Sequence, residues 1–156
     1  MTSSILTTHV GSLPRSKELS ELLFAKDKKE TFDKKIFDFE VKKNVENVVK
    51  QQLEVGIDII SDGEMSKISY ATYIKDRLKG FSGESERKAP ADLDAFDEYK
   101  IKIAKSGGTP TYVRPCCTSE LEIQDEESLK SDIKNFTFAL KKFNHSDGFM
   151  NSASPG

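Results

Sequence analysis

The chain has 156 residues, of which 36% are hydrophobic and 32% charged, and its formal net charge is -2. This length suits one domain with a core of its own. The near balance of charge creates no field that would attract nucleic acid or an anionic membrane. No run of about 18 apolar residues occurs, and the N-terminus lacks the features of a secretory signal. We therefore expect a cytoplasmic protein without nucleic-acid or membrane partners.

The first half of the chain alternates strand-like and helix-like patterns. Residues 5–10 predict a strand, and Ser16 is a candidate N-cap for a short helix after it. The clearest helix spans about residues 31–55, where apolar side chains recur at helical spacing and Gly56 follows as a stop. Residues 57–60 form an apolar run that predicts a buried strand. A buried strand directly after a helix is typical of a parallel β/α fold.

The second half continues this alternation around a long polar stretch at about residues 82–110, which we expect to be a surface excursion. The other predicted elements are a helix over 69–78, a short helix or strand pair around 96–104, a strand beginning at 112–114, a helix over 129–143 and the opening of a further strand at 148–151. The expected class is α/β, with three to four β/α units.

Three to four such units are too few to close an eight-stranded barrel. An open arrangement leaves a strand edge and apolar surface uncovered. Three explanations stay open: partner chains cover this surface, the chain is a fragment, or the fold is a smaller open sheet.

The end of the first predicted strand carries Gly11 and Ser12. Backbone N–H groups and a hydroxyl in such a turn can bind a small anionic ligand. The alternative is a glycine turn followed by a serine that caps a helix.

The end of the second predicted strand carries two acids, Asp62 and Glu64, on either side of Gly63. A carboxylate at this place can bind a substrate amino group or act as a base, and strand ends are where barrel enzymes place functional carboxylates. The alternative is that Asp62 caps the next segment and Glu64 is solvated.

The histidines and cysteines indicate no catalytic or metal centre. His9 reads as a hydrogen-bonded structural group, and His145 as a favourable cation near the end of a helix. Cys116 and Cys117 are adjacent, whereas zinc sites separate their cysteines, so two small buried side chains are the preferred reading. The sequence contains neither a phosphate-binding loop nor a G-x-S-x-G nucleophile motif.

The two strand ends also carry a family resemblance. Residues 8–15 (THVGSLPR) resemble the opening of the catalytic barrel of cobalamin-independent methionine synthases and their shorter single-barrel relatives. Residues 55–65 (VGIDIISDGEM) resemble that family's second strand. Residues 69–81 and 149–156 are similar to later parts of the single-barrel relatives, so the resemblance reaches from end to end and is loose between 82 and 110.

The resemblance implies a fold and a reaction. The fold is a (β/α)8 TIM barrel, of which residues 1–156 would form the N-terminal part of a single catalytic domain. The reaction is transfer of a methyl group from a methylated folate to the zinc-bound thiol of homocysteine, which forms methionine. Zinc lowers the pKa of a bound thiol and holds the sulfur as a nucleophile.

The resemblance also implies roles for five residues. Val10, Gly11 and Ser12 would hold the carboxylate of the amino acid, Glu64 would bind its amino group, and Asp62 would support that position. No residue is assigned a catalytic role. The family's zinc ligands are a histidine and a cysteine two apart, a glutamate and a second cysteine, all in the later half of the barrel. This sequence contains no H-x-C, so we expect neither zinc ligands nor activity from the chain alone.

Two alternatives to homocysteine methylation remain at this stage. One is an alkyl transferase that acts on another thiol, such as coenzyme M; such a thiol lacks the amino group that suits Glu64. The other is a truncated, non-catalytic fragment that self-associates through its open half-barrel.

Overall fold

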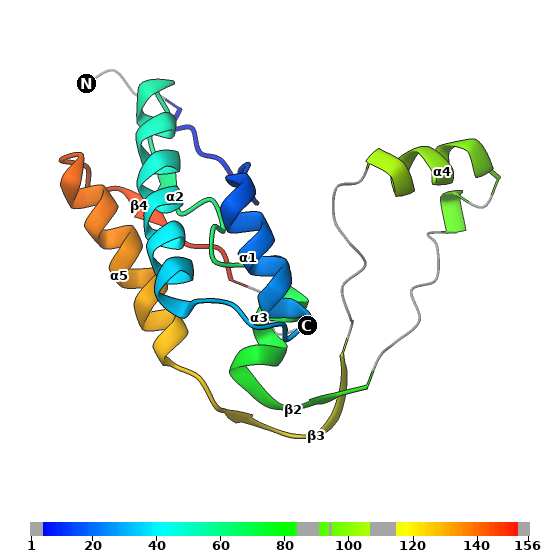
Figure 1. Ribbon diagram of the computed structural model, residues 1–156. Helices are drawn as coiled ribbons and strands as arrows, with labels where there is room; N and C mark the ends of the chain where they lie inside the picture. Colours follow the sequence, from blue (N-terminus) through cyan, green and yellow to red (C-terminus); the bar gives the residue numbers. More distant parts are fainter. Residues whose placement is uncertain (1–4, 84–90, 94, 107–114, 153–156) are drawn as a thin grey trace.

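The computed structural model describes residues 5–83, 91–93, 95–106 and 115–152 (Figure 1). In chain order its elements are α1 (Lys17–Asp27), α2 (Lys34–Glu54), β1 (Ile60–Ser61), α3 (Tyr70–Arg77), β2 (Leu78–Ser82), the 3-10 helix η1 (Ala91–Leu93), α4 (Asp97–Ser106), β3 (Cys116–Ile123), α5 (Glu127–Lys142) and β4 (Gly148–Phe149). Among the helices in these residues, none combines the length and apolar character that a membrane span requires.

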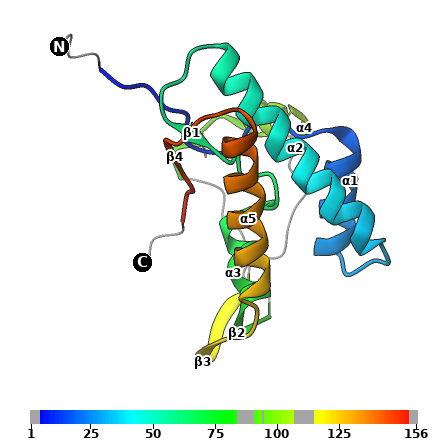
Figure 2. The ribbon, with the colours of Figure 1, turned by 90° about the vertical axis from the view of Figure 1, so that its left-hand side faces the viewer.

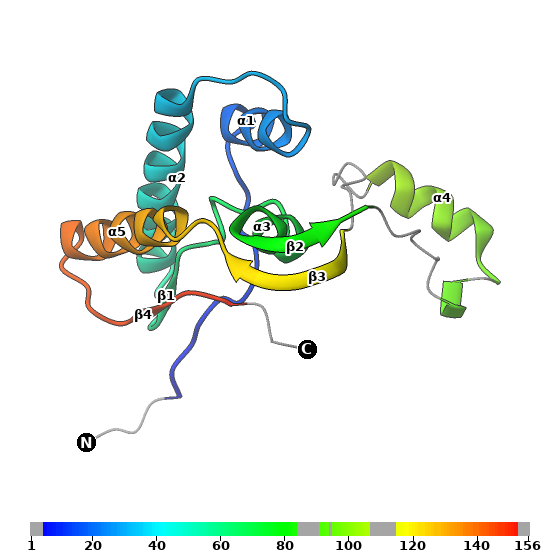
Figure 3. The same ribbon diagram turned by 90° about the horizontal axis from the view of Figure 1, so that it is seen from below.

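Three parallel segments lie side by side, with β1 in the middle. The N–H of Ile59 donates to the Thr7 carbonyl (3.0 Å), and the N–H of Ile60 donates to the Asp147 carbonyl (3.0 Å). Successive N–H groups of a strand point in opposite directions, so the two neighbours flank β1. α2 and α5 cover the β1–β4 pair from one side (Figures 2 and 3). The arrangement is the mixed α/β class that the sequence predicts.

The predicted strand over residues 5–10 is wrong in extent, because it is reduced to a single parallel bridge between Thr8 and Ile59. The Asp58 carboxylate accepts both the N–H of Thr7 (2.7 Å) and its hydroxyl (2.8 Å). The Thr7 N–H thus donates to the Asp58 side chain and not to a backbone carbonyl of a neighbouring strand, and the strand does not extend. Leu6 is exposed.

α2 is the central helix, and it packs against both α1 and α5. It begins at the N-cap Asp33, whose carboxylate accepts the N–H of Lys35 (2.7 Å). It ends before Gly56, whose φ of +81° is the left-handed conformation that favours glycine at a helix end. The core formed around it contains Leu19, Leu23, Phe37, Val41, Val45, Val48, Val49, Ile60, Met65, Phe136, Ala139 and Leu140.

The sequence pattern did not predict the antiparallel pair of β2 and β3, which projects from the helices (Figures 1 and 2). Leu78 lies opposite Ile123, and Ser82 lies opposite Cys116. The predicted helix over 69–78 is confirmed except that Leu78 already belongs to β2. The two strands lie about forty residues apart in the chain. Such long-range pairing produces no pattern within either segment of the sequence, because each strand depends on a distant partner.

The burial predicted for the two cysteines is also wrong. Cys117 is exposed and Cys116 is half-buried. Both lie on β3, which pairs with β2 in a two-stranded sheet. The predicted strand beginning at residues 112–114 falls outside the described residues.

The sequence predicts a short helix or a strand pair around residues 96–104, and the structure contains the helix, α4. It packs on η1 and lies apart from α1, α2 and α5 (Figure 1). The last predicted helix and strand are confirmed as α5 and β4. On α5, Phe136 and Leu140 are buried, whereas Leu129 and Ile133 of the same predicted stripe are exposed.

At Gly148, β4 packs closely against Phe136 and Leu140 of α5, and we expect Gly148→Ala to destabilise the fold. A Cβ there would lie 2.7 Å from the Phe136 ring and 3.1 Å from the Ile60 carbonyl oxygen. Overpacking of this kind costs about 1–3 kcal/mol, measurable by urea denaturation. The double variant Gly148→Ala/Phe136→Leu should recover part of the loss, because the smaller side chain leaves room for the methyl group. Equal stability of Gly148→Ala and the parent chain would contradict this packing.

Candidate functional site

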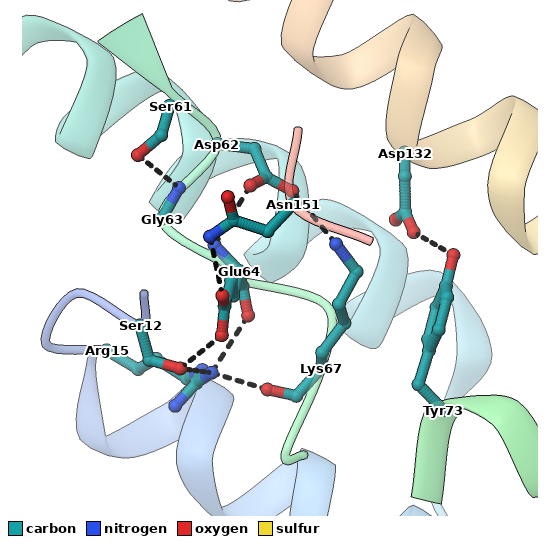
Figure 4. A network of polar contacts seen from close by, with 10 residues as sticks. All are labelled: Ser12, Arg15, Ser61, Asp62, Gly63, Glu64, Lys67, Tyr73, Asp132 and Asn151. Atoms are coloured by element: carbon teal, nitrogen blue, oxygen red, sulfur yellow. Dashed lines mark hydrogen bonds and ion pairs between the residues drawn. The ribbon is translucent and has the colours of Figure 1, made fainter. Parts of the chain in front are cut away.

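Polar side chains gather where the three parallel segments end (Figure 4). The carboxyl ends of parallel strands meet at one edge, which is where α/β proteins build their sites. Loops that follow the first segment, β1 and β4 supply the members of this cluster, which are Ser12, Arg15, Asp62, Glu64, Lys67 and Asn151.

The turn after β1 sets the direction of its acidic side chains. Gly63 and Glu64 both have left-handed φ angles, of 62° and 58°. The left-handed φ favours glycine at position 63, and a Cβ there would also lie 3.2 Å from both the Leu13 and Val48 side chains. The Asp62 carboxylate accepts the N–H of Glu64 (3.1 Å), as predicted for a capping aspartate.

The carboxylate of Glu64 is buried and is held by two neutral donors. The Ser12 hydroxyl donates to one of its oxygens at 2.6 Å, and the Asn151 amide donates to the other at 2.9 Å. Ser12 follows the segment at Thr8 and Asn151 follows β4, so the two donors come from the loops after the two segments that flank β1. The reading of Glu64 as a solvated side chain is therefore wrong: only 6% of it is exposed, because the turn directs it inward.

Arg15 joins the first loop to the turn after β1. One guanidinium nitrogen donates to the Glu64 carbonyl at 2.8 Å and to the Lys67 carbonyl, and it lies 3.4 Å from the Ser12 hydroxyl. Burial lowers the pKa of Arg15, and the nearby Glu64 and Asp62 carboxylates oppose that shift. The guanidinium remains charged, because its usual pKa is far above neutral.

A buried ion pair lies beside this turn. Lys67 Nζ is 3.3 Å from an Asp62 oxygen, and both side chains are at most 5% exposed. Lys67 also lies over the Tyr73 ring, 5.2 Å from its centroid. The Tyr73 hydroxyl donates to Asp132 on α5 at 2.9 Å. A continuous polar path thus runs from Asp62 to α5.

Asp132, at the α5 end of this path, is a buried acid with a raised pKa. Burial raises the pKa of Asp132, and the hydrogen bond from Tyr73 partly opposes that shift. Burial also raises the pKa of Tyr73, and the neighbouring Asp132 charge adds to the effect. Tyr73 therefore stays protonated and donates.

Of the five predicted site residues, the structure brings Ser12, Asp62 and Glu64 together. Val10 is exposed, and Gly11 has a left-handed φ of 102°. Sequence reasoning missed Lys67 as a member, and it gave no role to Arg15 or Asn151. Arg15 lies inside the motif at residues 8–15, and Asn151 ends the last predicted strand. Their positions at the ends of predicted strands were the one signal that could have identified them.

The donor set in the described residues does not suit a metal ion. No three His, Cys, Asp or Glu side chains among them are grouped to hold one. The Nε2 atom of His9 is buried without a hydrogen-bond partner in this part of the chain, and the role of His9 as a hydrogen-bonded structural group stays a prediction. His145 lies beyond α5, with its Nε2 3.2 Å from the Asp58 carbonyl oxygen.

Comparisons with known proteins point to one family. Residues 5–95 match the family model described as cobalamin-independent synthase, catalytic domain. The chain is 33% identical over 75 residues to the 5-methyltetrahydropteroyltriglutamate–homocysteine methyltransferase of Bifidobacterium longum, covering 48% of this chain and 10% of that protein. A probable enzyme of the same name in Schizosaccharomyces pombe is 34% identical over 77 residues, with the same two coverages. The chain thus spans 10% of the length of these curated relatives.

A solved structure resembles the fold. The B12-independent methionine synthase from Shewanella sp. W3-18-1, in complex with selenomethionine, aligns with a TM-score of 0.50 and 23% identity. The alignment covers 84% of this chain and 35% of that one. It supports a shared α/β fold over most of the chain.

Removing Lys67 should destabilise the chain strongly, because Asp62 would keep a buried and uncompensated charge. We expect Lys67→Met to cost about 3–5 kcal/mol in the free energy of unfolding, measured by urea denaturation. Lys50→Met removes an exposed pair with Glu54 on α2 and should cost about 1 kcal/mol or less. Similar losses in the two variants would contradict the importance of the buried pair.

Asp132 should make stability depend on pH. Its raised pKa means that the folded chain holds this proton more tightly than the unfolded chain, so stability falls as pH rises from the ordinary carboxyl pKa through the raised value. Asp132→Asn should unfold at a higher temperature than the parent chain at pH 7, and the gap should close towards about pH 4. Asp147→Asn, at an exposed position, is the control. A lower melting temperature for Asp132→Asn at pH 7 would refute this account.

Proposed function

The chain belongs to the family of cobalamin-independent synthase catalytic domains, and on that premise we propose that it binds homocysteine for methyl transfer to the thiol. The carrying observation is the buried Glu64 carboxylate, which is oriented at the strand ends by Ser12 and Asn151. Two of the relatives matched are named homocysteine methyltransferases. The methyl donor proposed with them is a methylated folate.

The site suits the amino-acid end of such a substrate. A buried carboxylate is a partner for an ammonium group, because its charge attracts the cation and its oxygens accept charge-assisted hydrogen bonds. The loop Val10–Ser12 lies beside it and is proposed to meet the substrate carboxylate through backbone N–H groups and the Ser12 hydroxyl. Asp62 supports Glu64 by accepting its N–H.

Homocysteine fits this site better than a thiol without an amino group. Coenzyme M and similar thiols would bring no cation to Glu64, and a buried charge without its intended partner weakens binding. The amino acid is therefore the proposed acceptor.

The proposed architecture is a (β/α)8 barrel. The segment at Thr8, β1 and β4 are proposed as three consecutive strands of it, with α2 and α5 on the outside. Residues 1–156 would then belong to one catalytic domain, in which the excursion at about 82–110 contains α4.

Zinc is implied by the family, where it would lower the pKa of the acceptor thiol. The described residues do not fit it: Cys116 and Cys117 lie on β3, and no grouping of three suitable ligands occurs in this part of the chain. We assign neither a zinc ligand nor a folate contact to them. The proposed contribution of these residues is to bind and orient the amino acid, without activating its thiol.

Glu64→Gln should weaken homocysteine binding by about tenfold or more, because it removes a charged partner of the ammonium group. Calorimetry on the purified chain measures this, with zinc determined by elemental analysis on the same sample. Glu54→Gln, at the exposed end of α2, is the control and should bind like the parent chain. Equal affinities of the parent chain and Glu64→Gln would refute the proposed site, and stoichiometric zinc would refute the statement on ligands.

A further inference from the structure

We propose that Arg15 is a positioning residue that holds Glu64 in the orientation needed to select ligands with an ammonium group. The inference rests on the proposed function, because it takes Glu64 as the ammonium partner. It adds a residue that the sequence analysis left without a role.

The backbone at Glu64 has an unusual conformation. Gly63 and Glu64 both have left-handed φ angles, and for a residue with a Cβ that conformation is unfavourable unless other contacts fix it. The N–H of Lys67 donates to the Glu64 carbonyl (3.1 Å), which closes a short turn. The direction of the Glu64 side chain depends on that turn.

Arg15 donates hydrogen bonds to the backbone of this turn. One nitrogen of its guanidinium reaches the carbonyls of Glu64 and Lys67, which are the two ends of the same turn. It thereby fixes the backbone on which the Glu64 carboxylate stands (Figure 4). A hydrogen bond from a charged donor is stronger than one from a neutral donor, so Arg15 suits this task.

Arg15 also connects the turn to Ser12 and the Glu64 carboxylate, the groups proposed to bind the ligand. The same nitrogen lies 3.4 Å from the Ser12 hydroxyl, and that hydroxyl donates to Glu64 at 2.6 Å. Arg15 therefore acts on both Ser12 and Glu64 at once. If this turn loses its hydrogen bonds to Arg15, the Glu64 carboxylate is no longer held in one orientation, whereas the rest of the fold keeps its packing around α2.

Two ligands separate positioning from a general loss of structure. Homocysteine and 4-mercaptobutanoic acid share the thiol, the chain length and the carboxylate, and they differ in the amino group. The parent chain should bind homocysteine about tenfold more tightly or better, and Glu64→Gln should lose this preference. Arg15→Met should also lose it and bind the two ligands within about threefold of one another. Arg15→Lys keeps a charged donor and should retain much of the preference.

The affinities come from calorimetry, with thermal unfolding as the check that each variant is folded. If Arg15→Met does not fold, Arg15→Gln takes its place, and failure of both to fold would overturn the inference in favour of a purely structural role. A folded Arg15→Met or Arg15→Gln variant that keeps the parent preference, or that weakens binding of both ligands equally, would also overturn it. If the parent chain shows no preference, or Glu64→Gln retains it, the proposed function fails instead, so the two failures are distinguishable.

Discussion

The side-chain amide of Gln52 forms two hydrogen bonds that fix where β1 ends. Buried on α2, it accepts the N–H of Ser61 (3.0 Å) and donates to the Ser61 carbonyl (2.8 Å). Asn44, two turns earlier on α2, does the same for the first loop by accepting the N–H of Ser16 (2.9 Å). A buried amide must be satisfied, so both loops are held at set positions relative to this helix. The turn that carries Glu64 begins directly after Ser61 and depends on that anchor.

The polar cluster follows from this placement. Directing Glu64 and Asp62 inward takes two charges out of water, which is costly unless each is matched. Lys67 matches Asp62 as a buried ion pair, and Arg15 spans the turn through two backbone carbonyls. The Ser12 hydroxyl and the Asn151 amide orient the Glu64 carboxylate, which is the group proposed to bind the ammonium group of the ligand.

The same logic connects the cluster to the helices around it. Tyr73 on α3 bonds Asp132 on α5, and Lys75 on α3 pairs with Asp27 at the end of α1, 3.2 Å apart. Asp132 is buried, Tyr73 is half-buried, and the Lys75–Asp27 pair is mostly buried. These contacts connect α3 to two helices that do not follow it directly in the chain. β2 follows α3 directly and β3 leads back to α5, so the antiparallel pair is held at the end next to these helices while its other end projects (Figure 1).

The sequence by itself determined the elements whose signals are local. The apolar stripe marks α2, Gly56 marks its end, and the apolar run before Asp62 marks β1. The pairing of Asp62 and Glu64 at a strand end was equally visible. Tertiary structure decided that the strand at Thr8 shrinks to a bridge, that β2 pairs with a distant β3, and that Cys117 is exposed. It also decided which donors meet at Glu64. These outcomes depend on contacts between residues far apart in the chain, and such contacts leave no periodicity or spacing within any one segment.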